Sequence, residues 1–337
     1  MPALKQINIG LKQFWLTHKK WITYLKIALA FLTVSFILYK LLIAYNIDEK
    51  VAFFQFDFSF KNSVFLIFAV LLLFLNWGLE TLKWQLLINQ FEDIKFFDAL
   101  KAVFSGVTLS IITPNQIGDF AGRVIHLKTL NKIKGSLVTV IGHTAQSLVT
   151  AIFGMYALLA FLSKADFYVY IYWKYIAVAF LIMHAVVIFG FIRIDLVYNA
   201  LSRFRFFSKI EQYVIVFKSY TKTQLTKVFL ISALRYAVFL FQYVFLLQFF
   251  GVHVGLVNCF IGVIAVFCIQ SVVPSFFLLD IGLRGASALF VFSELSNGNH
   301  AFDLGVLLSA YSLWVINMMV PALLGLVFIL KHKFSFK

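Results

Sequence analysis

The segments TPNQIGDFAGR (residues 113–123) and VPSFFLLDIGLR (residues 273–284) decide how this chain is organised. In each segment a proline precedes an aspartate and an arginine that are four residues apart, and each segment lies within a long apolar stretch. Charged side chains are costly to keep in an apolar environment, and within membrane segments they mark functional positions. These two segments are therefore the first candidates for a functional site.

The composition is that of an integral membrane protein. Of the 337 residues, 62% are hydrophobic and 13% are charged, which is too apolar for a soluble domain of this length. Apolar runs of about 20 residues fit membrane helices, whereas the strands of a membrane barrel are shorter and alternate in polarity. We therefore predict an all-α integral membrane protein with a single transmembrane domain over residues 1–337.

The apolar runs predict about six full transmembrane helices and two broken segments. The broken segments, 99–130 and 256–295, contain the two proline motifs, and each is interpreted as a hairpin that returns to its starting side. Counted with the hairpins, the chain has about eight helical units. The expected full spans cover residues 22–45, 63–82, 135–162, 171–192, 228–250 and 303–330.

The basic residues predict the orientation in the bilayer. With the N-terminus in the cytoplasm, 20 Lys and Arg residues fall in cytoplasmic segments, and only Lys50, Lys61, Lys164 and Lys174 fall outside. This imbalance agrees with the positive-inside rule. We expect a multi-pass protein of the plasma (inner) membrane with both termini in the cytoplasm. The cytoplasmic segments counted are 1–20, 83–101, 128–134, 193–227 and 331–337.

The same topology predicts an inverted two-fold repeat. Residues 22–162 and 171–330 would each contain span, span, hairpin and span in that order, and the hairpins would enter from opposite faces. Inverted repeats whose broken helices meet near the midplane are a recurrent transporter architecture. The alternative is two ordinary helical hairpins that happen to contain proline.

The aspartates and arginines of the two motifs are the main candidate substrate-binding residues. In helices that begin after the proline, Asp119 and Arg123 share one face, as do Asp280 and Arg284. A helix N-terminus together with an arginine can bind a phosphate group. The alternative is an internal ion pair that stabilises the hairpin and binds nothing. Asn115 and Gln116, in the first turn, complete the candidate contacts.

Proline and glycine are expected to build these turns. Pro114 with Gly118 and Pro274 with Gly282 would end one helix and free the backbone before the next. Such irregular backbone is tolerated at membrane depth only where protein or water covers it. We therefore expect a polar cavity beside the hairpins.

Two further charged residues lie within predicted spans or close to their ends. Glu80 and Arg235 lie at similar depth, so they could pair with each other, and we weigh a packing role above a substrate role. His126 and His143 with Gln146 could form a proton relay, but we favour the interpretation that they form ordinary interhelical hydrogen bonds.

Several classes of function lack support in the sequence. Cys259 and Cys268 both lie in an apolar run and are expected to be small core residues, and no spacing of His, Cys or carboxylates predicts a metal site. We therefore predict no metal and no cofactor. The formal net charge is +15, but the basic residues are scattered over membrane-flanking segments. We expect membrane lipids with anionic head groups as partners and no nucleic acid.

At the two proline motifs the sequence resembles the family of the lysylphosphatidylglycerol synthase transmembrane region, a flippase-like domain of bacterial and archaeal membrane proteins. The first half of that family typically shows Pro-x-x-x-Gly-(Asp/Glu) followed by Arg. Pro114, Gly118, Asp119 and Arg123 match this pattern. The resemblance covers nearly the whole chain and implies movement of lipids between leaflets.

The second half matches the family less closely. Relatives often show a Pro-Gly-Gly-like turn and then Gly-x-Arg-Glu, which Pro274, Gly282 and Arg284 match. The residues Ser275–Phe277 replace the glycine-rich turn, and Gly285 stands where a glutamate is common. If that glutamate takes part in coupling or head-group binding in relatives, another residue must do so in this chain, and Asp280 is the candidate.

Three functions are compatible with these observations. The leading hypothesis is a flippase that moves a phosphate-bearing lipid between leaflets and is not an enzyme. The second is a membrane-embedded lipid-modifying enzyme, and the third is a non-transporting partner of envelope-lipid biosynthesis enzymes. The synthetase domain of bifunctional relatives has no counterpart in these 337 residues, so lipid aminoacylation is not predicted.

Overall fold

A computed structural model describes residues 60–113, 116–164, 169–202, 211, 215–273, 277–296 and 302–331. In these ranges the structure contains helices and no strand, which confirms the predicted all-α class. The predicted span 22–45 lies outside the described residues, as do Pro114, Asn115 and Pro274. The elements in chain order are α4 (Phe60–Ile88), α5 (Phe96–Ile112), α6 (Gly118–Val124), α7 (Lys132–Lys164), α8 (Val169–Ile192), α9 (Ile194–Leu201), η3 (Ile215–Ser219), α11 (Lys222–Phe249), α12 (Leu256–Val272), α13 (Phe277–Leu295), α14 (Asp303–Trp314), η5 (Val315–Met319) and α15 (Val320–Lys331).

Five helical segments of the described chain are long and apolar enough to cross a membrane. They correspond to the five predicted spans that fall in the described ranges, and α14, the π-helical turn η5 and α15 together form the last of them. The segments are Asn62–Ile88, Lys132–Phe161, Tyr175–Ile192, Lys222–Phe249 and Asp303–Lys331.

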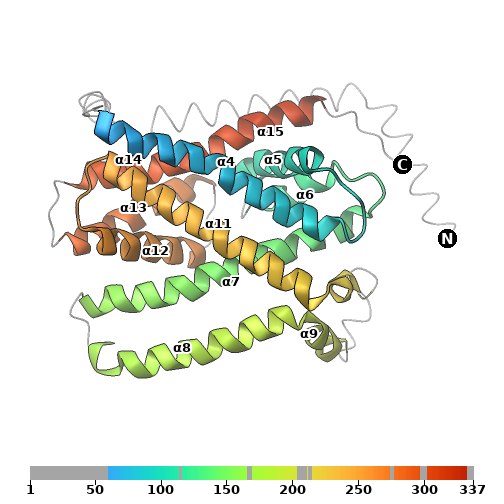
Figure 1. The fold of residues 1–337 in the computed structure, drawn as a ribbon, viewed down its shortest axis with the longest axis horizontal. Coiled ribbons are helices and arrows are strands. Elements are labelled where there is room, and N and C mark those ends of the chain that lie inside the picture. The colour runs from blue at the N-terminus through green and yellow to red at the C-terminus, as the bar shows by residue number, and fades with distance from the viewer. Residues whose placement is uncertain are drawn as a thin grey trace.

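Both proline motifs break the chain into pairs of shorter helices, as predicted. The first break separates α5 from α6, and the second separates α12 from α13. In Figure 1, α5 and α6 lie toward the right-hand end of the molecule, and α12 and α13 lie toward the left-hand end. This arrangement agrees with hairpins that enter from opposite faces. Their return without crossing the bilayer stays a prediction.

Local chemistry explains the first break. At the end of α5, Thr113 adopts an extended backbone conformation, and its Oγ1 accepts a hydrogen bond of 2.7 Å from the Gly118 N–H. Gln116 lies in the left-handed region with a φ of 57°. A Cβ at Gly118 would collide with the backbone of Leu109. Glycine therefore lets α6 fold back closely against α5.

Small residues also bring the hairpins close to the long helices. Helix α5 packs against α15, where a Cβ at Gly325 would collide with the Phe104 carbonyl and where Thr108 Oγ1 donates 2.7 Å to the Ala322 carbonyl. Helix α12 packs against α7, where a Cβ at Gly154 would lie 2.6 Å from Cys268 Cβ. Close backbone approach through small residues is typical of packing between membrane helices.

These contacts form matched pairs under the predicted repeat. Helices α4 and α11 would be counterparts, and they pack against each other at the centre of the bundle (Figure 1). The contact of α5 with α15 would correspond to that of α12 with α7. The pairing supports the inverted repeat, which stays a prediction.

A chain of buried amides joins the helices at this centre. Asn76 of α4 donates 2.7 Å to Asn317 Oδ1, Asn317 donates 2.9 Å to Gln242 Oε1, and Gln242 donates 2.7 Å to the Ala69 carbonyl. Asn317 belongs to η5, and π-helical turns occur often at functional sites. These amides are interhelical hydrogen bonds of the kind that polar side chains form between membrane helices.

Several helices extend beyond the predicted spans, and the two longest extensions, six residues each, are at the start of α11 and the end of α4. Helix α11 begins at Lys222, six residues before the predicted span, because Thr221 and Gln224 form a capping box. Helix α4 ends at Ile88, beyond the predicted boundary at residue 82. This extension places Lys83 inside the bundle, although the topology prediction had assigned it to a cytoplasmic connection.

Candidate functional site

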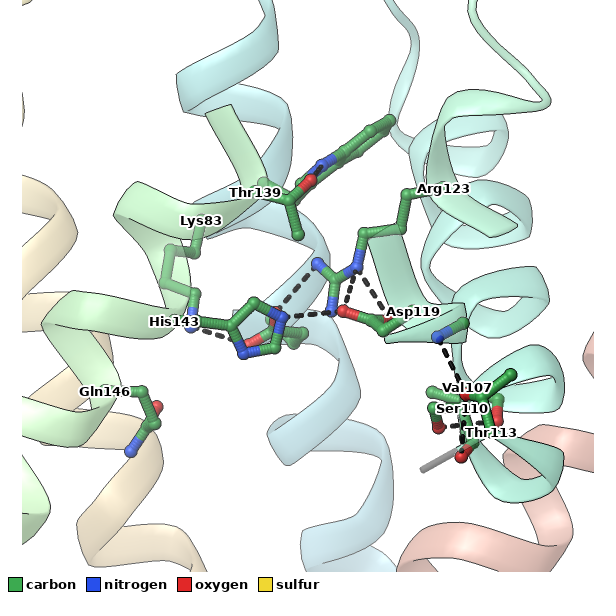
Figure 2. A network of polar contacts seen from close by, with 12 residues as sticks. Lys83, Val107, Ser110, Thr113, Asp119, Arg123, Thr139, His143 and Gln146 are labelled. Carbon is green, nitrogen blue, oxygen red and sulfur yellow. Dashed lines mark hydrogen bonds and ion pairs between the residues drawn. The ribbon is translucent and has the colours of Figure 1, made fainter. Parts of the chain in front are cut away.

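The first proline motif contributes to a buried ion cluster formed by four helices. Figure 2 labels its members Lys83, Asp119, Arg123 and His143. Helix α4 supplies a carboxylate and a lysine, α6 supplies the aspartate and arginine of the motif, α7 supplies a histidine, and α11 supplies a second arginine. We call this group the ion cluster. Its members are Glu80, Lys83, Asp119, Arg123, His143 and Arg235.

Arg123 links the two carboxylates of the ion cluster. Its Nε lies 2.9 Å from Asp119 Oδ1, so the pair expected from the four-residue spacing is present. Its Nη1 lies 2.9 Å from Glu80 Oε1 on α4. The arginine side chain is only 4% exposed. It therefore holds α6 against α4 through two charge-assisted hydrogen bonds.

Glu80 forms ion pairs with three cations. Besides Arg123, Lys83 Nζ lies 2.7 Å from Glu80 Oε2, and Arg235 Nη1 lies 3.3 Å from the same oxygen. The proximity of Glu80 and Arg235 that their similar depth suggested is thus present. Lys83 was not identified as a site residue, although its i, i+3 spacing from Glu80 was the available signal.

His143 forms the accessible edge of the ion cluster. Its Nε2 lies 2.6 Å from Asp119 Oδ2, yet its side chain is 40% exposed. Figure 2 shows it between Lys83 and the Asp119–Arg123 pair. An exposed imidazole that touches a buried carboxylate gives a ligand or a proton a route to the charges behind it.

Arg235 is held beside this edge by polar and aromatic neighbours. Its Nη1 donates 3.2 Å to Gln146 Oε1, and its guanidinium lies 5.6 Å from the Trp77 ring and 5.0 Å from the Phe239 ring. Cation–π contacts of this kind favour a desolvated cation. Among the described residues, Arg235 Nε is buried and has no hydrogen-bond partner. One N–H of this guanidinium therefore lacks an acceptor in the described part of the chain.

Glycines allow the motif to reach this position. A Cβ at Gly106 on α5 would collide with the Asp119 carboxylate, and a Cβ at Gly122 on α6 would collide with the Ser105 carbonyl. The two short helices therefore touch through backbone, which brings Asp119 and Arg123 into the interior. Ser105 Oγ is also hydrogen-bonded to His126 Nε2 at 2.8 Å, so His126 joins the hairpin arms and not the ion cluster.

The ion cluster carries a formal excess of one positive charge. Two carboxylates, Glu80 and Asp119, face the three cations Lys83, Arg123 and Arg235, with His143 counted as neutral. Apart from His143, the charged side chains are at most 12% exposed. Buried charges need compensation, so this arrangement favours an additional anion.

The described candidate residues of the second motif, Gly282 and Arg284, lie on a different helix, α13. Arg284 is half-buried on α13, and its carbonyl accepts a 3.2 Å hydrogen bond from Ser287 Oγ. Gly282, on the same helix, is exposed. Asp280 belongs to α13, but its side chain lies outside the described residues, so the predicted pair with Arg284 stays a prediction. In the first turn, Gln116 is exposed.

The part of the chain that the structure describes holds no group of three or more His, Cys, Asp or Glu residues that could bind a metal. Cys259 and Cys268 are buried free thiols, as expected for core residues. What the site offers chemically is a desolvated set of cations, two carboxylates and one accessible imidazole.

The fold and the site define a polytopic helical membrane protein with two proline-broken helix pairs and a buried ion cluster at the first of them. The sequence model of the family described as "Lysylphosphatidylglycerol synthase TM region" matches residues 24–325. The chain therefore belongs to this family. Comparisons with curated proteins and with solved structures find no match.

Proposed function

We propose that this protein is a lipid translocase that moves a phosphate-bearing lipid between the leaflets of the plasma membrane. The head group would pass through the polar interior while the acyl chains remain in the bilayer. The protein would act as a transporter and not as an enzyme, with both termini in the cytoplasm. The chain belongs to a family of membrane domains, which supports the membrane location that this proposal requires.

One observation carries the proposal: a buried ion cluster has more cations than carboxylates and opens to its surroundings through His143. A structural ion pair would need only balanced charges. The third cation raises the affinity of the interior for an anion, because an uncompensated buried charge is costly. A phosphate group is an anion that arginine and imidazole bind well.

The geometry divides the candidate residues into two roles. Arg123 is occupied by Asp119 and Glu80, so we assign these three residues to the frame that positions the site. Arg235 and His143 would contact the phosphate, because one has an unused donor and the other is accessible. Arg284 stays the predicted contact on the second hairpin.

The test is a lipid-scrambling assay in reconstituted vesicles. Fluorescent phosphatidylglycerol and phosphatidylcholine would be compared by dithionite quenching of the outer leaflet. Removing one charge-assisted hydrogen bond with Arg235→Gln is expected to slow movement of the anionic lipid by about 10-fold or more, since such a bond contributes about 1.5–3 kcal/mol. His143→Gln is expected to act in the same direction.

Lys227→Gln is the matched control because it removes one positive charge from the same helix at an exposed position. It is expected to move phosphatidylglycerol at the wild-type rate. Monodispersity of each variant would show that it is folded. The proposal is wrong if the purified wild-type protein moves no anionic lipid, or if folded Arg235→Gln and His143→Gln variants both match it.

A further inference from the structure

A polar cavity lies at the predicted cytoplasmic end of the first hairpin, outside the ion cluster. It has a volume of about 740 Å³ and is formed by the α4–α5 connection, the start of α5, the α6–α7 connection and the end of α15. Four lysines line it together with one histidine and one aromatic ring. These residues are Lys95, Lys101, Lys128, Lys331, His126 and Phe328.

Three carboxylates also line the cavity, Glu92, Asp93 and Asp98, and two of them are engaged by other groups. Glu92 accepts hydrogen bonds of 2.7–2.8 Å from the backbone N–H groups of residues 128–130 and from the Thr129 hydroxyl. Burial alone would raise the pKa of Glu92, but these hydrogen bonds hold it below its ordinary value of 4.5. Asp98 is paired with Lys101 at 2.8 Å. Glu92 and Asp98 therefore have partners of their own.

Four lysines face three carboxylates in this lining, a formal excess of one positive charge with His126 counted as neutral, and three of the lysines are unpaired among the described residues. Within the described part of the chain, Lys95, Lys128 and Lys331 form no ion pair, and all three are exposed. They come from three separate segments that converge on one hollow. Convergent lysines act as point charges for phosphate, and a membrane-surface cavity of this charge also attracts anionic head groups.

We propose that this cavity is a binding site for an anionic phosphate group at the membrane surface. The group belongs to a lipid head group or to a soluble phosphate compound. Lys95, Lys128 and Lys331 bind the phosphate oxygens, and Phe328 contacts the apolar part next to them. The site is distinct from the ion cluster, although Ser105–His126 links its floor to the α5–α6 hairpin.

The cavity lies next to the same short helix, α6, that carries Asp119 and Arg123 of the ion cluster. His126 follows Arg123 by three residues, so the two sites share the short stretch that includes α6. A head group bound here would be held within the reach of the hairpin before it enters the interior. The binding itself does not depend on translocation and is measured without it.

The experiment is a lysine-labelling footprint of the full chain in nanodiscs. An amine-reactive reagent is applied in phosphatidylcholine discs, in discs that contain phosphatidylglycerol, and in phosphatidylcholine discs with added glycerol phosphate. Mass spectrometry then gives the labelling rate of each lysine. Lys227, which is exposed on the same predicted side but outside the cavity, is the internal control.

We expect Lys95, Lys128 and Lys331 to be labelled about fivefold more slowly when the phosphate source is present, as for a site occupied about 80% of the time. The rate at Lys227 should change by less than about twofold, because diffuse surface attraction is weak at physiological salt. Protection only by phosphatidylglycerol identifies a lipid head group, and protection by glycerol phosphate identifies a soluble source.

Two outcomes would overturn the proposal. In the first, neither phosphate source protects the three lysines. In the second, Lys227 is protected to the same extent, which would show only accumulation of charge at an anionic surface. A Lys128→Gln, Lys331→Gln variant checks the assignment, since protection of Lys95 should be lost in it. Failure here leaves the translocase proposal standing, because that proposal is tested by lipid movement.

Discussion

Replacing Arg123 with glutamine tests whether the ion cluster holds the first hairpin in place. The arginine lies 2.9 Å from oxygens of both Asp119 and Glu80 and is 4% exposed. At an effective dielectric constant of about 20, two charges about 4 Å apart attract by about 4 kcal/mol. Removing one partner of a buried pair costs about 3–5 kcal/mol, because it leaves the other charge uncompensated.

The expected loss for Arg123→Gln is therefore about 3 kcal/mol or more in the free energy of unfolding. Asp119 would keep His143, and Glu80 would keep Lys83 and Arg235, which places the loss near the lower end of that range. The assay is reversible unfolding by SDS in mixed micelles. Lys227→Gln should change the free energy by less than about 0.5 kcal/mol, as is usual for an exposed position.

A double-mutant cycle separates the pair from its surroundings. Asp119→Asn should cost less than Arg123→Gln, because asparagine can still bond with His143. The double variant should be more stable than the sum of the single losses predicts, by about 1–3 kcal/mol. The reasoning is refuted if the Arg123→Gln loss is below about 1 kcal/mol, as for an exposed ion pair, or if the two losses add.

Three further predictions use other contacts. Gly325→Ala should lower the free energy of unfolding by about 1–3 kcal/mol, because its Cβ would collide with the Phe104 carbonyl; Gly78→Ala, where the space is open, should not destabilise. Asn317→Leu should cost about 1–2 kcal/mol in the same assay, because it leaves partners on α4 and α11 unpaired; a loss below about 0.3 kcal/mol would contradict this. Because the pKa of Glu92 is lowered in the folded protein, its contribution to stability should be complete above pH 4.5 and lost as the pH falls through the folded-state value. Thermal unfolding midpoints between pH 3 and pH 6 should show this loss in the wild type and not in Glu92→Gln.

Much of the fold could be predicted from the sequence, because the length of the apolar runs reflects the bilayer that surrounds them. Long apolar runs must be helical in a bilayer, so every predicted span in the described ranges coincides with a helix. The ends were less accurate. Charged residues predict a membrane boundary near residue 82, whereas α4 continues to Ile88 because Glu80 and Lys83 compensate each other within the protein.

The site was predictable in its parts but not in its assembly. The four-residue spacing gave the Asp119–Arg123 pair, and depth brought Glu80 and Arg235 together. The place of His143 beside Asp119 depends on how α7 packs on α6, which no local pattern encodes. The π-helical turn that carries Asn317 is likewise a product of packing.

The arrangement of Asp119 and Arg123 bears on whether such a motif serves its own helix or a ligand. A self-contained pair would cancel its field and bind nothing. Here Arg123 is shared with Glu80, and Glu80 in turn draws Lys83 and Arg235 into the interior. The aspartate and arginine of the motif thus position the site. The cation that we assign to the ligand is Arg235, which lies on α11. A search for the ligand of this protein should therefore begin at α11 and the accessible edge of α7, and not at the motif that revealed the site.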